Sequence, residues 1–70
     1  MGVTIIDQLI RATIEVCMPK ATVAQKYTAR YELADAIQHR IHGQGRVIEP
    51  RRAAMRHSLL QVYDRLNHDT

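Results

Sequence analysis

Residues 4–20 read TIIDQLIRATIEVCMPK, and apolar side chains recur in this stretch at intervals of three and four positions. That interval is the spacing of one face of an α-helix. Thr4 followed by Asp7 has the spacing of a capping box, which places a hydroxyl and a carboxylate near the exposed amides of a helix start. Pro19 cannot continue a helix. The stretch therefore predicts a helix over residues 4–18.

Two further helices follow from caps and helix breakers. Thr22 and Gln25 form a second capping box, which predicts a helix over residues 22–42. Pro50 has a fixed φ and no amide hydrogen, so it suits the first turn of a third helix over residues 50–67. We therefore expect an all-α fold, a helical hairpin preceded by an N-terminal helix, in one small domain that takes in all 70 residues.

The first helix is apolar over a wider arc than one neighbour needs. Its apolar side chains cover roughly 200° of the helix, whereas a helix that lies on a single neighbour needs about 100°. A chain of 70 residues also hides only about 60% of its unfolded surface. We therefore expect a homodimer, the commonest remedy for surplus apolar surface. The side chains expected at a dimer or partner contact are Ile6, Ile10, Ile14, Tyr27, Tyr31 and Tyr63.

The positive charge of the chain is concentrated in one segment. The chain has ten Lys and Arg against seven Asp and Glu, and between residues 39 and 57 five arginines face a single acid, Glu49. Two of these arginines fall in the first turn of the third helix, where the helix dipole disfavours positive charge. The segment is either a functional surface or a solvated face neutralised by Glu49 and by the acids of the second helix. Its arginines are Arg40, Arg46, Arg51, Arg52 and Arg56.

An arginine-rich surface selects an anionic partner, and two classes of partner qualify. An acidic protein surface is favoured, because no tyrosine lies within the basic segment to stack on unpaired bases. The sequence thus predicts a small adaptor or inhibitor that modulates another protein sterically, of a size that mobile elements often encode. The alternatives are a dimeric nucleic-acid-binding regulator whose arginines contact phosphates, and a subunit of a larger assembly of identical chains.

No combination of residues predicts catalysis, a metal site or a cofactor site. Cys17 falls in the apolar arc of the first helix, which predicts a small core residue. Asp35 and His39 lie four residues apart, but no serine or cysteine is placed to complete a catalytic relay. The spacing of His39, His42 and His57 does not converge three or four ligands, as zinc requires. We therefore expect a binding protein with no enzymatic activity.

The sequence also bears on location. No apolar stretch approaches the 18–20 or so residues of a membrane span, and the first 18 residues lack the features of a signal peptide. A single cysteine cannot form an internal disulfide. We expect a cytoplasmic protein that does not enter a membrane.

Overall fold

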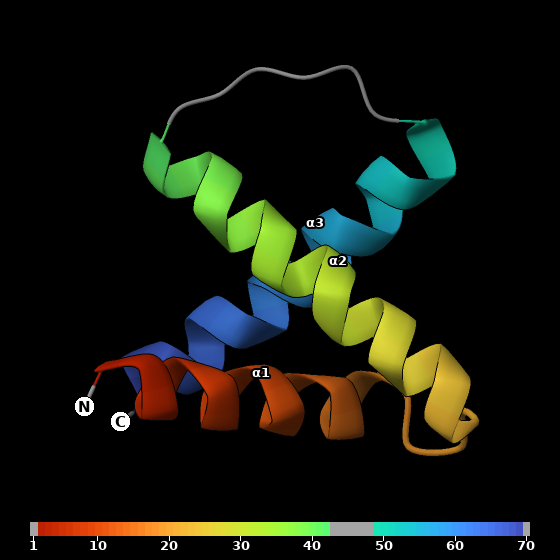
Figure 1. The fold of residues 1–70 in the computed structure, drawn as a ribbon, viewed down its shortest axis with the longest axis horizontal. Helices are drawn as coiled ribbons and strands as arrows, with labels where there is room; N and C mark the ends of the chain where they lie inside the picture. Colours follow the sequence, from red (N-terminus) through yellow and green to blue (C-terminus); the bar gives the residue numbers. More distant parts are fainter. Residues whose placement is uncertain (1, 43–48, 70) are drawn as a thin grey trace.

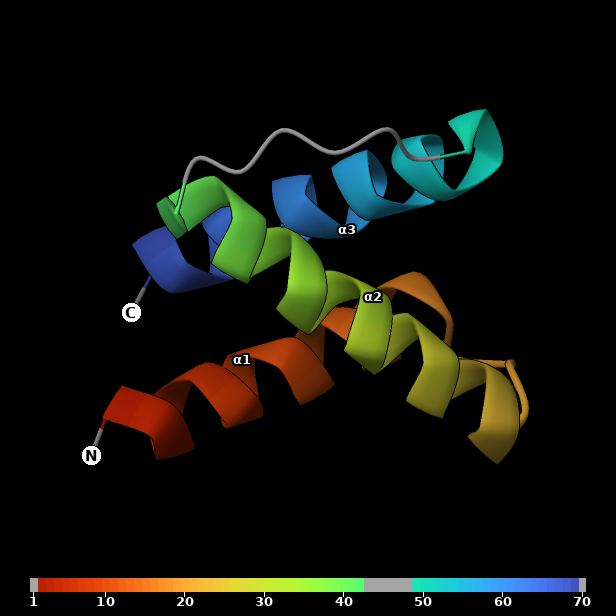
Figure 2. The same cartoon turned by 45° about the horizontal axis from the view of Figure 1, so that its top comes forward.

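The computed structural model describes residues 2–42 and 49–69, which form three packed α-helices and no strand. These helices are α1 (Gly2–Cys17), α2 (Val23–His42) and α3 (Pro50–His68). Figure 1 shows α2 and α3 crossing each other on one side of α1, and Figure 2 shows the same crossing from a second direction. The expected all-α fold with three packed helices is confirmed.

The helix starts show which capping signals operate. Thr22 and Gln25 form a reciprocal capping box, because each backbone N–H donates to the other's side-chain oxygen, over 2.9 and 3.1 Å. Glu49 caps α3 by accepting from the backbone N–H groups of Arg51 and Arg52, with Pro50 following it. By contrast, α1 begins at Gly2, so Thr4 lies inside the helix and is not its cap.

The core lies where all three helices meet. Ile14 and Leu33 are almost completely buried, and Thr13 is buried beside them because its hydroxyl donates to the carbonyl of Leu9 over 2.7 Å. A polar side chain that satisfies its own hydrogen bond within the helix can be buried at little cost. The buried cluster consists of Leu9, Ile10, Ile14, Ala29, Leu33, Ile37, Leu59 and Tyr63.

One core prediction is wrong. Cys17 is exposed, because it is the last residue of α1, where the chain leaves the three-helix contact and turns towards α2. Partial burial still raises the pKa of its thiol above the usual value. A raised pKa lowers the thiolate fraction, so the side chain is a poor nucleophile at neutral pH.

Large apolar side chains remain on the surface of α1 and α2. On α1, Ile5 is 56% exposed and Val16 is 62% exposed, on the part of the apolar arc that the other helices leave uncovered. On α2, Val23, Tyr27 and Tyr31 are 79%, 55% and 74% exposed. Within the described part of the chain, no helix combines the length and the apolar character needed to cross a membrane.

Candidate functional site

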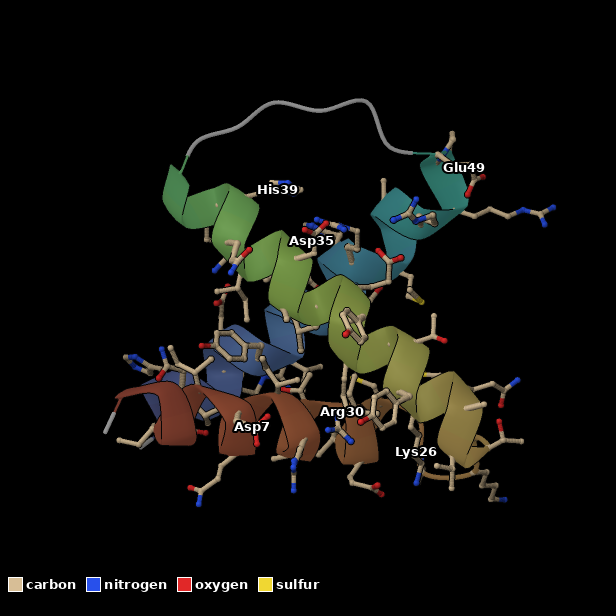
Figure 3. All side chains as sticks on the ribbon, in the orientation of Figure 1. Asp7, Lys26, Arg30, Asp35, His39 and Glu49 are labelled. Atoms are coloured by element: carbon tan, nitrogen blue, oxygen red, sulfur yellow. The ribbon has the colours of Figure 1, made fainter. Side chains whose placement is uncertain are left out.

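The arginine segment meets acidic side chains at the crossing of α2 and α3. Arg56 is only 5% exposed, and one of its guanidinium nitrogens, Nη1, donates to Glu32 Oε1 over 3.0 Å and to Asp35 Oδ2 over 2.9 Å. Its Nη2 lies 3.1 Å from Nδ1 of His39. Figure 3 shows Asp35 and His39 on the side of α2 that faces α3. Arg56 therefore joins two helices and is not available to a partner.

Burial alone would lower the pKa of Arg56, but its hydrogen bonds to Asp35 and Glu32 outweigh that effect, so its pKa lies above the usual value. The same network acts on Glu32, whose pKa is lowered chiefly by the hydrogen bond from Arg52, against the opposing effect of burial. Both shifts favour the charged forms, so the network holds ionised groups at neutral pH.

The other arginines of the segment are less enclosed. Arg52 Nη2 lies 2.9 Å from Glu32 Oε2, and Arg40 Nη1 lies 2.7 Å from Asp64 Oδ1, with both arginine side chains about half exposed. Arg51 is exposed, and its guanidinium makes no ion pair within residues 2–42 and 49–69. Arg46 lies outside the described residues. Thus the four described arginines do not form one open surface, and among them Arg51 alone makes no ion pair with the described residues.

The arginines at the start of α3 are compensated by Glu49, in line with one of the two interpretations that the sequence left open. Positive charge in the first turn of a helix is unfavourable by itself. Here the carboxylate of Glu49 sits at the amides of Arg51 and Arg52, so a negative charge lies at the positive end of the helix. This placement compensates for the two arginines without involving a partner.

An apolar groove lies beside the arginine-bearing turn of α3. The N-terminal halves of α2 and α3 diverge from their crossing (Figures 1 and 2), and a groove of about 400 Å3 opens next to them. Met55, one turn after Arg51, and Met18 are half-buried in its walls. The sequence alone does not predict this groove, because its lining comes from three separate segments of the chain. The lining residues are Met18, Ala24, Gln25, Thr28, Ala29 and Met55.

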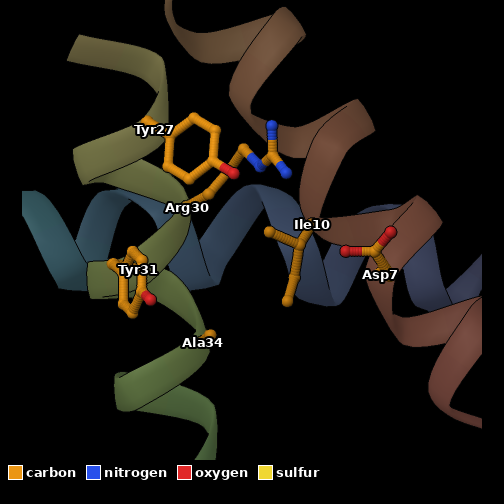
Figure 4. A pocket seen from close by; sticks show the side chains of 6 residues that line it. All are labelled: Asp7, Ile10, Tyr27, Arg30, Tyr31 and Ala34. Atoms are coloured by element: carbon orange, nitrogen blue, oxygen red, sulfur yellow. The ribbon is translucent and has the colours of Figure 1, made fainter. Parts of the chain in front are cut away.

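A second groove, of about 260 Å3, separates α1 from the outer face of α2 (Figure 4). Ile10 and Ala34 line it, and Tyr27 and Tyr31 stand on its α2 side. The guanidinium carbon of Arg30 lies 4.8 Å from the centre of the Tyr27 ring, a cation–π contact. This contact orients Tyr27 although half of that side chain remains exposed.

The expected contact residues of α1 and α3 divide between core and surface. Ile10, Ile14 and Tyr63 are buried in the core of the single chain, so they are not exposed to a partner in this structure. Ile6 is 40% exposed. Tyr63 and Arg56 are both buried, so neither side chain is accessible to a partner in this structure.

The described residues bring together no metal-binding group of three His, Cys, Asp or Glu side chains. His39 instead faces Arg56 and Asp35, with Nδ1 3.6 Å from Asp35 Oδ2. Comparisons of the chain with protein-family models, with curated proteins and with solved structures find no match.

Proposed function

We propose that the protein is a non-enzymatic binding module that occupies an acidic surface of another protein and modulates or inhibits it sterically. The observation that carries this proposal is the methionine-lined groove beside Arg51. Flexible, polarisable methionine side chains adapt to varied apolar surfaces. The groove is open rather than enclosed, as suits a protruding segment of a second protein better than a small substrate.

The arginines of the first turn of α3 favour a partner that carries acidic residues around its contact surface. The guanidinium of Arg51 has no acidic partner among residues 2–42 and 49–69. Arg52 shares Glu32 with Arg56 and keeps about half of its side chain in solvent. Charges at the rim of an interface mainly accelerate encounter and exclude wrong partners, while the desolvated centre supplies affinity. Met18 and Met55 would supply that centre.

The proposal includes a homodimer and a cytoplasmic location. Exposed Tyr27 and Tyr31 support the dimer, because large apolar side chains gain free energy when a second surface covers them. The single cysteine is in keeping with a reducing compartment.

A nucleic-acid partner receives less support from the geometry. Arg40, Arg52 and Arg56 direct their guanidinium groups at carboxylates of the same chain. Phosphates would have to compete with Asp64, Glu32 and Asp35 for these groups, which weakens the salt-dependent attraction that sequence-independent binding requires.

The test is affinity capture from native cytosol with three matched baits: the wild-type chain, Arg51→Glu and Met55→Gln. Arg51→Glu should leave the fold intact, because an acid in the first turn of a helix suits the helix dipole. We expect both variants to lose protein partners that the wild type retains.

Arg65→Glu is the control, because Arg65 is exposed on α3 at the end remote from the groove. It should capture the same partners as the wild type. Identical capture by all four baits would contradict the proposed binding surface.

A further inference from the structure

The outer face of α2 carries an uncharged seam. Ala24, Tyr27, Tyr31 and Ala34 follow one another at intervals of three, four and three residues, the spacing of a helix–helix contact. On a helical projection this seam lies roughly 150° from the core-facing residues of α2. Both tyrosines are more than half exposed and Ala24 is exposed as well, whereas Ala34, at one end of the seam, is half-buried and packs against the core cluster.

The seam reads the same in both directions, with a small residue, two tyrosines and a small residue. If two copies of α2 run antiparallel about a twofold axis level with residue 29, Tyr27 faces the partner's Tyr31 and Ala24 faces the partner's Ala34. An isologous interface requires this reciprocity, in which residue i meets residue j and j meets i. The alanines, about 15 Å apart along the helix, permit close backbone approach on either side of the tyrosines.

Charge and exposure favour a second copy as the occupant. The four seam residues are uncharged, so two identical seams meet without opposing like charges. Tyr27 and Tyr31 are 55% and 74% exposed in the single chain, so each gains free energy when a second tyrosine covers it.

We infer that two copies of this chain pair through antiparallel α2 helices, with Tyr27 of each copy packed on the partner's Tyr31. This inference rests on the homodimer that is part of the proposed function, and it specifies which surface forms the dimer interface. The groove between α1 and α2 in Figure 4 adjoins the seam, so Ile10 and Arg30 border the interface. Met18, Met55 and Arg51 lie outside the seam, and Ala24 belongs both to the seam and to the lining of the methionine groove.

The register is tested by disulfide cross-linking in a Cys17→Ser background, which removes the native thiol. Chains carrying Ala24→Cys and Ala34→Cys are mixed in equal amounts and oxidised. We expect a cross-linked dimer that contains one chain of each kind, and little product from either variant alone, because identical positions lie about 15 Å apart in the antiparallel pair. Self-linkage of either variant, or no mixed product, would overturn the inference.

The tyrosine contact is tested by sedimentation equilibrium. Tyr31→Glu changes a side chain that is 74% exposed in the single chain, so the fold should survive, which circular dichroism verifies. The dimer dissociation constant should rise by about thirtyfold or more, as for an interface hot spot. Val16→Glu, at an apolar position on α1 that is 62% exposed, should dimerise like the wild type. Equal effects of the two substitutions would refute the α2 seam.

These measurements use the isolated chain, whereas the proposed function is tested by the capture of partner proteins from cytosol. If the α2 seam is wrong, Tyr31→Glu still dimerises, and the dependence of capture on Arg51 and Met55 is unaffected. If the proposed binding surface is wrong, capture no longer depends on Arg51 and Met55, while the cross-linking result stands.

Discussion

Arg56 shows how a charged side chain can serve the fold rather than a surface. Its guanidinium contacts Glu32 and Asp35 of α2 and His39 of the same helix, and it is nearly as buried as the apolar core. The removal of one member of a buried ion pair leaves its partners without compensation. The arginine therefore matters for stability and for the angle at which α2 and α3 cross.

We predict that Arg56→Ala lowers the free energy of unfolding by about 3 kcal/mol, the lower end for a broken buried pair, since Asp35 is partly exposed. Urea denaturation at neutral pH measures this change. Arg40→Ala, which breaks the exposed pair with Asp64, should cost less than about 1 kcal/mol. Similar losses for both variants would mean that Arg56 is solvated in solution.

The pH dependence of stability follows from Glu32. The hydrogen bond from Arg52, with that from Arg56, holds the pKa of Glu32 below its usual 4.5 in the folded chain. A lowered carboxyl pKa stabilises the native state above the unfolded-state pKa, and this stabilisation is lost as the pH falls through the folded-state pKa. Unfolding should therefore become easier as the pH falls below about 4.5.

Glu32→Gln should weaken this acid sensitivity and lower the stability at pH 7. Denaturation curves at pH 7, 5, 4 and 3 measure both effects. Glu15→Gln, which removes an exposed ion pair with Lys26, is the matched control and should follow the wild type. If the unfolding free energy of Glu32→Gln depended on pH as steeply as that of the wild type, other carboxyl groups would govern acid unfolding.

At the scale of the helix, the start of α3 depends on Glu49. Its carboxylate accepts from two backbone amides that have no partner inside the helix, over 3.0 and 3.1 Å. We predict that Glu49→Ala costs about 1 kcal/mol of unfolding free energy, as for the loss of a helix cap. Chemical denaturation checks this value.

Glu49→Gln keeps an acceptor but loses the charge near the helix dipole, so it should cost less than Glu49→Ala. An alanine variant as stable as the wild type would mean that solvent caps α3 equally well.

The helices could be predicted from sequence because their signals are local. The capping box at Thr22 and Gln25, the prolines and the apolar spacing all act within a few residues, and the structure forms α2 and α3 where those signals lie. The start of α1 was less well placed, since Thr4 resembled a cap but lies within the helix. The spacing of apolar residues identifies the face of a helix, but it does not determine the residue at which the helix begins.

The surface could not be predicted in the same way, because it depends on which residues of distant helices meet. Arg56 pairs with acids 21 and 24 positions earlier in the chain, so a count of charges within one segment overstated the exposed positive charge. Cys17 shares the apolar arc of α1 but lies beyond the helix contact. The groove at Met18 and Met55 likewise depends on the crossing of α2 and α3.

At the scale of the whole molecule, the arginines that pair with acids of the same chain lead us to expect little or no binding of nucleic acid. We predict no mobility shift of random duplex DNA at micromolar protein and moderate salt. The physical reason is that Arg40, Arg52 and Arg56 already pair with acids of the same chain, so these three cations are less able to displace counterions from phosphates. A shift that weakens steeply as salt is added would favour the regulator over the protein-binding module.

The central claim is that this small chain exposes more apolar surface than a solitary copy can keep, and that a second copy covers it. Sedimentation equilibrium of the wild-type chain over a wide concentration range tests this claim most directly. We predict a closed dimer of twice the chain mass, with no larger species. A folded chain that stays monomeric at several hundred micromolar would contradict the account, and growth into open-ended oligomers would instead identify an assembly subunit.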